Sequence, residues 1–232
     1  MSTPGWARIG AISGFLFVGL FLTAFFGLQD PASPAAGSAS PEEIASFFER
    51  ERLRMALGTL AYMAGWTAFL VFIASIRSPG NPPDSVRRLE WVATIAGVIV
   101  AILALAGVAL QAEILISDTT TDEATLVSQL ALFDASSGFF GITPFLRAVF
   151  VGALSIVALG EGGSKRWLGW FGLLVAATNV LGGIDFVIPP DWSLTGDPLL
   201  DLIAFLAWIL AASLGLLVRS SNGLRGQPVA LD

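Results

Sequence analysis

The sequence predicts an all-α integral membrane protein, a polytopic bundle of about six transmembrane helices with one or two short external amphipathic helices. The residues A, V, I, L, M, F, W, Y and C make up 55% of the 232 residues, before 25 glycines are counted. A soluble domain is roughly 45–50% apolar with glycine included. Charged residues make up 13% of this chain, against about 25% in a soluble domain. We therefore expect residues 1–232 to form a single membrane domain surrounded by lipid.

Six stretches can supply the transmembrane helices, because a crossing needs about 20 largely apolar residues. Five stretches meet this requirement clearly: Ile9–Leu28, Met55–Ile76, Trp91–Ile116, Trp167–Ile188 and Leu199–Val218. The sixth, Ser137–Leu159, is interrupted in its first third by Gly138, Gly141 and Pro144. Proline removes a backbone donor and crowds the carbonyl four residues earlier, so we predict a kink or a delayed start there.

The first stretch has some features of a secretory signal, because Met1–Arg8 is positively charged and Pro31–Ser40 is rich in small residues. Signal-peptide cores are about 7–15 apolar residues long, and this stretch is longer. We favour a retained helix, with cleavage as the alternative.

Basic residues divide unequally between the two sides of the membrane when the helices alternate in direction. One side holds eight of them: Arg8, Arg77, Arg87, Arg88, Lys165, Arg166, Arg219 and Arg225. The other side holds Arg50, Arg52 and Arg54, and Arg147 lies within the fourth stretch. Cytoplasmic loops carry an excess of Lys and Arg. We therefore expect a multi-pass protein of the cell (inner or plasma) membrane with both termini in the cytoplasm.

Residues 41–54 form the predicted external amphipathic helix. Ser40 can cap this helix, proline suits its first position, and Glu43 completes a capping box. Three apolar residues then share one face at helical spacing: Ile44, Phe47 and Phe48. A lid or a partner-docking surface is one interpretation, and a helix lying on lipid or on the other helices is the one we favour. A second short external helix is predicted from residue 121 towards Gly138.

Four ionisable residues lie within the predicted stretches, where a charge is costly and is by default a candidate functional site. They are Glu113, Arg147, Asp185 and Asp201, each near the outer end of its stretch, and Asn179 adds an amide near mid-membrane. An unpaired arginine there costs about 2.5–3.5 kcal/mol on insertion scales, so we predict that Arg147 pairs with at least one carboxylate. We interpret this intramembrane polar cluster as structural first, and as a solvated substrate or ion site second.

Cysteine and histidine are both absent from the chain. Their absence excludes disulfides, iron–sulfur clusters, His-ligated haem, the commonest zinc sites and Cys–His or Ser–His nucleophiles. We predict no catalytic residue, no metal site and no cofactor. The net charge of −6 argues against nucleic acid as a partner.

Two segments carry a resemblance to a known group of proteins. Pro41-Glu42-Glu43-Ile44 runs into Arg52-Leu53-Arg54, and Lys165-Arg166-Trp167-Leu168-Gly169-Trp170-Phe171-Gly172 enters the fifth stretch. Together they resemble uncharacterised multi-pass membrane proteins of an actinobacterial type, a domain-of-unknown-function family. The resemblance covers most of the chain and implies a bacterial inner-membrane location, but it implies no activity and no site residues.

These observations favour a non-enzymatic structural or regulatory membrane component of unknown molecular activity. Its expected partners are the lipid bilayer and either further copies of the chain or other members of a membrane complex. The alternative is a small-solute or ion transporter or binding protein that uses a polar layer in the outer half of the bundle. An intramembrane enzyme acting through the carboxylates is the weakest of the three interpretations.

Overall fold

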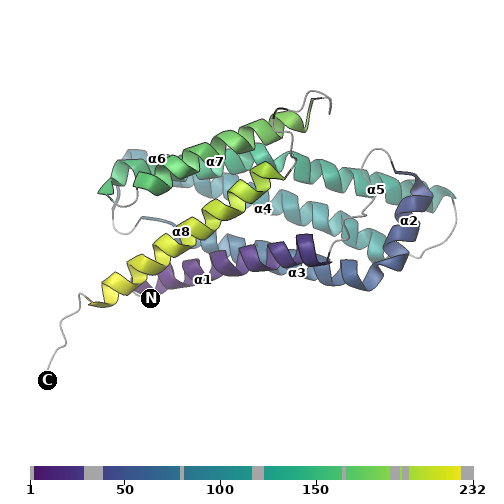
Figure 1. Ribbon diagram of the computed structural model, residues 1–232, viewed down its shortest axis with the longest axis horizontal. Helices are drawn as coiled ribbons and strands as arrows, with labels where there is room; N and C mark the ends of the chain where they lie inside the picture. The colour runs from purple at the N-terminus through teal and green to yellow at the C-terminus, as the bar shows by residue number, and fades with distance from the viewer. Residues whose placement is uncertain are drawn as a thin grey trace, which may run out of the picture.

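The computed structural model describes residues 3–28, 39–78, 81–116, 123–163, 166–188, 194 and 199–225, and every regular element in these ranges is helical. Six helical stretches in these ranges are long and apolar enough to cross a membrane, which confirms the predicted fold class. The elements in chain order are α1 (Thr3–Leu22), the π-helical turn η1 (Thr23–Leu28), α2 (Pro41–Arg50), α3 (Arg52–Ser75), α4 (Asp84–Ile116), α5 (Glu123–Gly141), α6 (Thr143–Glu161), α7 (Arg166–Asp185) and α8 (Leu200–Arg225) (Figure 1).

Six of these helices form a closed ring. α1 packs against α3, α3 against α4, α4 against α6, α6 against α7, α7 against α8, and α8 returns to α1. α1 begins and α8 ends at the same end of this ring, here called the terminal end (Figure 1). α2 lies at the opposite end, here called the α2 end (Figure 1).

Aromatic side chains fill the centre of the ring. Phe17 of α1, Phe69 of α3, Phe150 of α6 and Phe205 of α8 are each at most 1% exposed. The ring centroid of Phe69 lies 4.9 Å from that of Phe17 and 5.5 Å from that of Phe150. The centroids of Phe150 and Phe205 lie 6.4 Å apart. Aromatic rings attract one another at such separations in tilted or edge-to-face arrangements. This four-phenylalanine core ties four helices together in the middle of the bundle.

Small residues let α1 approach its two neighbours closely. A Cβ atom on Gly10 would overlap the side chain of Ser75 in α3 and would lie 3.2 Å from Leu216 in α8. One turn later, a Cβ atom on Gly14 would lie 2.9 Å from the ring of Phe72. Close packing through small residues is a main source of helix association in lipid, so these glycines fix α1 between α3 and α8.

The predicted amphipathic helix is present as α2 with its capping box, but it ends at Arg50 rather than at residue 54, because the chain turns at Glu51 and α3 begins at Arg52. The Ser40 hydroxyl accepts a hydrogen bond from the Glu43 amide at 3.2 Å, and the Ser40 amide donates to the Glu43 carboxylate at 2.9 Å. The buried face of α2 packs into an apolar cluster at the α2 end, here called the α2 cluster: Ile44, Phe47, Phe48, Met55, Ile114, Leu115 and Phe133. α2 therefore covers the ends of α3, α4 and α5 (Figure 1).

A break separates α5 from α6 at Ile142, within the stretch where the sequence places a kink or a delayed start. Pro144 has no amide hydrogen to donate to the carbonyl of Phe140, which accepts the Thr143 hydroxyl at 2.8 Å instead. Gly138 and its neighbours up to residue 141 thus belong to α5, and α6 begins at Thr143.

The helices differ in length, so the two ends of the ring differ in shape. α4 has 33 residues, which corresponds to about 50 Å, whereas the hydrocarbon core of a bilayer is about 30 Å thick. The last turns of α4 extend towards the α2 end together with α5 and the start of α3 (Figure 1). This end of the protein projects beyond the ends of α1, α7 and α8.

Candidate functional site: a buried polar centre

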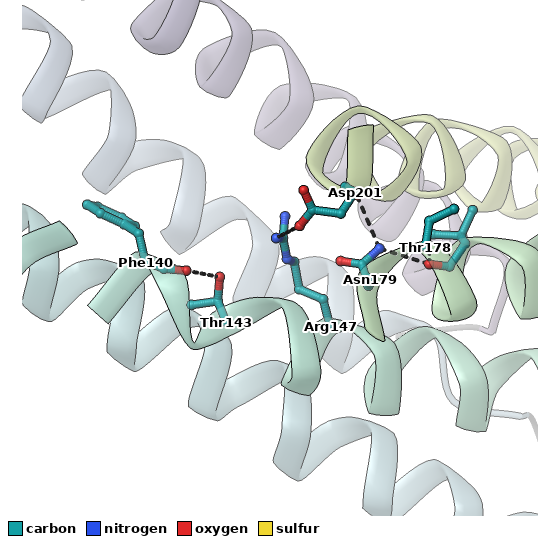
Figure 2. Close-up of polar contacts among 7 residues, drawn as sticks. Phe140, Thr143, Arg147, Thr178, Asn179 and Asp201 are labelled. Atoms are coloured by element: carbon teal, nitrogen blue, oxygen red, sulfur yellow. Dashed lines mark hydrogen bonds and ion pairs between the residues drawn. The ribbon is translucent and has the colours of Figure 1, made fainter. Parts of the chain in front are cut away.

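Three of the five predicted site residues come together between α6, α7 and α8. The guanidinium of Arg147 forms an ion pair with the carboxylate of Asp201, through Nη2 and Oδ2 (Figure 2). Both side chains are only 7% exposed. Asn179 of α7 is completely buried beside them. We call Arg147, Asn179 and Asp201 the polar centre.

The start of a helix places the acid of the polar centre. Asp201 lies in the first turn of α8, where the positive end of the helix dipole stabilises a carboxylate. Arg147 lies in the second turn of α6, just after the break at Ile142. The ion pair therefore joins the second turn of α6 to the first turn of α8, two helices that are not consecutive in the ring.

Asn179 ties the third helix to this pair. Its Nδ2 group donates to the carbonyl of Val175 in its own helix at 2.9 Å and to the carbonyl of Asp201 at 3.1 Å (Figure 2). The hydroxyl of the neighbouring Thr178 donates to the carbonyl of Val175 as well, at 2.8 Å, and so bonds within α7. Asn179 is thus the side chain of α7 that reaches across to α8.

A glycine brings α7 close enough for this contact. A Cβ atom on Gly182 would lie 2.7 Å from Cγ and 2.8 Å from Cβ of Asp201. Real side chains essentially never approach so closely, so only glycine fits here without a shift of α7 or α8. The next residue, Gly183, allows the ring of Phe145 in α6 to approach α7 in the same way, because a Cβ atom on Gly183 would lie 2.7 Å from Cε2 of that ring. The glycine pair sets the spacing of three helices around the polar centre.

Two polar atoms of the centre have no hydrogen-bond partner within the described ranges. They are Nε of Arg147 and Oδ1 of Asn179, and both are buried. In Figure 2 the amide oxygen of Asn179 lies on the side of the carboxamide that faces the Arg147 side chain. Arg147 also lies against the ring of Phe205, with Cζ 5.5 Å from the ring centroid. The polar centre therefore rests directly on the four-phenylalanine core.

The two other predicted site residues lie apart from the polar centre. Glu113 is exposed in the last turn of α4, beside the buried Ile114 and Leu115 of the α2 cluster. Asp185 is half-buried at the end of α7 and accepts a hydrogen bond from the amide of Leu194 at 2.6 Å. Instead of a layer of four charges on four helices, the centre holds one pair.

The chemistry available to the polar centre is limited by its composition. One cation and one anion neutralise each other, and the remaining member is an amide. No group of three or more Asp or Glu side chains suited to a metal ion occurs among the described residues. The centre can hold helices together and can accept or donate a few hydrogen bonds, but it offers no pair of open carboxylates for acid–base work.

A second buried charge, Glu90, lies just outside the predicted transmembrane stretches. Glu90 lies in α4 near the terminal end, is 8% exposed, and accepts a hydrogen bond from the Ser78 amide at 2.7 Å. It lines a cavity of about 10 Å³ together with Arg77, whose guanidinium lies 4.5 Å from the ring centroid of Trp91. The predicted stretch begins one residue later, at Trp91, and nothing in the local sequence predicts that the turn after α3 buries Glu90.

No protein-family model, curated protein or solved structure matches this chain. Its function must therefore be inferred from its own residues and their arrangement.

Proposed function

We propose that this protein is a non-enzymatic structural or regulatory component of a cell membrane, in which the polar centre locks the helix bundle. The observation that carries this proposal is the burial of Arg147 and Asp201 against each other. A charge that binds a substrate has to be open to that substrate. Here both charges are matched by protein, and the surrounding helices cover them.

The four-phenylalanine core supports this function over a channel. Its rings come from α1, α3, α6 and α8 and meet at the middle of the ring of helices. Protein interiors packed in this way are as dense as organic crystals. A path along the axis of the bundle would have to displace these rings.

The location and orientation of the protein belong to the same proposal. Six helices able to cross a membrane fit a multi-pass protein, and α1 and α8 share the terminal end (Figure 1). Because the connections and chain ends on that side carry eight of the twelve basic residues, we assign it to the cytoplasm. The resemblance to actinobacterial multi-pass proteins suggests a bacterial membrane, and further copies or other membrane subunits are the proposed partners.

A small-solute transporter or binding protein is the second candidate. The observation in its favour is the pair of unpartnered buried atoms, Nε of Arg147 and Oδ1 of Asn179. Buried polar groups are nearly always hydrogen-bonded, so a site that leaves two of them unpaired invites a polar occupant.

Single cysteines distinguish the two candidates, because the chain has none of its own. We would introduce Glu113→Cys, Asn179→Cys and Asp185→Cys separately and treat intact cells with a membrane-impermeant thiol reagent. If the bundle is a closed structural unit, the exposed position 113 reacts and the buried position 179 does not. Reaction at position 179 would mean that an aqueous path reaches the polar centre, and the transporter would replace our proposal.

Two further cysteine variants serve as controls for folding and for orientation. Thr178→Cys probes the same depth on a half-buried side chain, in case the Asn179→Cys variant does not fold. Ser221→Cys, exposed near the end of α8, should react only after the cells are permeabilised. Its reaction in intact cells would reverse the proposed orientation and leave the structural role untouched.

A further inference from the structure

We propose that the polar centre binds one water molecule, held between the Nε–H group of Arg147 and the Oδ1 atom of Asn179. Both atoms are buried and lack a hydrogen-bond partner within the described ranges. One is a donor and the other an acceptor. Figure 2 shows the amide oxygen on the side of Asn179 that faces Arg147. A single molecule that accepts from the first atom and donates to the second would satisfy both.

The remaining hydrogen bonds of the centre fix these two atoms in place. Nη2 of Arg147 is committed to Asp201, and Nδ2 of Asn179 is shared between the carbonyls of Val175 and Asp201. Asn179 cannot exchange its oxygen and nitrogen without losing both of those bonds. The unpartnered donor and acceptor are thus built into the site by the bonds around them.

The chemistry of the two atoms selects the occupant. It must accept one hydrogen bond from Arg147 and donate one to Asn179. An anion could accept from the guanidinium, but Asp201 already balances that charge, and a fully deprotonated anion has no hydrogen for the amide oxygen. A metal cation could bind the amide oxygen but would meet the positive charge of Arg147. Water is neutral, does both, and is the usual partner of otherwise unsatisfied buried polar groups.

The setting accounts for why such a molecule stays in place. Asp201 already balances the charge of Arg147, so the site attracts no further ion. The ring of Phe205, part of the four-phenylalanine core, packs against the guanidinium, with its centroid 5.5 Å from Cζ of Arg147. A trapped water would supply an acceptor for the Nε–H group, the one buried nitrogen of Arg147 without a hydrogen-bond partner in the described ranges.

Radiolytic hydroxyl labelling of the full chain in lipid vesicles, in water enriched in oxygen-18, tests the proposal. Radicals formed from a bound water oxidise the side chains next to it, even where bulk solvent has no access. Phe205 lies against the guanidinium of Arg147 that would hold the water. Phe72 is equally buried, at 0% against 1% exposed, and lies at the contact of α3 with Gly14 of α1. We expect Phe205 to take up oxygen-18 several-fold faster than Phe72. Equal rates for the two rings would overturn the proposal.

The variant Asn179→Leu provides the second measurement, because it removes the acceptor and keeps a side chain of similar size. In this variant the rate at Phe205 should fall to that of Phe72, and an unchanged rate would contradict the assignment of the site. If the variant does not fold, the comparison of the two rings in the unaltered protein still decides. An experimental map with Nε and Oδ1 in direct hydrogen bond would also overturn the proposal.

The outcomes for this water and for the proposed function can be told apart. A trapped water predicts labelling of Phe205 while position 179 stays closed to the thiol reagent. Thiol access at position 179 would overturn the structural function. Absence of labelling at Phe205 would overturn the water site alone.

Discussion

The polar centre and the four-phenylalanine core are neighbours, yet the two are held together in different ways. Arg147 lies over the ring of Phe205, and both are buried. The core consists of four rings on four helices, each with several neighbours, so its cohesion is a sum of many small contacts. The polar centre depends on one ion pair and one amide, whose bonds are directional and have no substitutes nearby.

The difference shows which interactions choose the helix partners in lipid. Lipid tails are as apolar as phenylalanine, so ring packing competes with equally good contacts to the bilayer. A buried charge has no such alternative, because it is costly wherever it lacks its partner. The core therefore fills the bundle, and the polar centre specifies that α6, α7 and α8 meet in one register.

The largest expected effect comes from breaking the ion pair from one side. Asp201→Ala leaves Arg147 buried without a counter-charge, and losses of about 3–5 kcal/mol are usual for half of a buried pair. We expect the free energy of unfolding to fall by this amount. Denaturant titration in detergent micelles measures the fall.

The double variant Arg147→Leu with Asp201→Leu sharpens this prediction. Replacing both partners of a buried ion pair with apolar residues is often neutral or stabilising. We therefore expect the double variant to recover most of the stability lost by Asp201→Ala. A double variant as unstable as the single one would show that the pair is needed for more than charge balance.

A smaller effect is expected from crowding the contact between α7 and α8. Gly182→Ala places a Cβ atom 2.7 Å from Cγ of Asp201, and overpacking of this kind costs about 1–3 kcal/mol. Gly138→Ala is the matched control, since a Cβ atom there meets nothing within 4 Å. Thermal unfolding of both variants, followed by size-exclusion chromatography after heating, should separate them. Equal melting behaviour would mean that α7 can move away without cost.

The smallest effect is expected in the four-phenylalanine core. Phe69→Leu keeps an apolar side chain among the other three rings and should cost about 1 kcal/mol, the difference between typical truncations of the two residue types. The same substitution at Phe26, which is 55% exposed, controls for the change of residue at a surface position. Denaturant titration checks both. If Phe69→Leu were as damaging as Asp201→Ala, the contrast between the two regions would fail.

Local features of the sequence are sufficient to predict the fold class and α2. Composition and the length of apolar runs indicate a membrane bundle, and Ser40 with Glu43 is a local capping signal that the structure reproduces. The break at Ile142 also follows from local chemistry, because the missing amide hydrogen of Pro144 acts only on its own turn. In each case, the information lies within a few residues of the feature.

The composition of the polar centre was less accessible to sequence reasoning. The sequence predicts a carboxylate partner for Arg147 but does not distinguish Asp201 from Glu113 and Asp185, since all three have a similar predicted depth. The choice depends on which helices are neighbours in the ring and on the close approach at Gly182. Both are tertiary properties, so no local pattern carries them.

The lengths of α4 and its neighbours have a mechanical consequence. α4 is one unbroken helix that contains both Glu90, near the terminal end, and Ile114, in the α2 cluster. α5 and α6 together run back antiparallel to α4, and this return path is interrupted at Ile142, about one turn before Arg147. One side of the protein is therefore a stiff rod and the other a rod with a joint. A tilt of the projecting α2 end would therefore be transmitted along the unbroken α4, whereas on the other side bending would concentrate at Ile142, next to the ion pair.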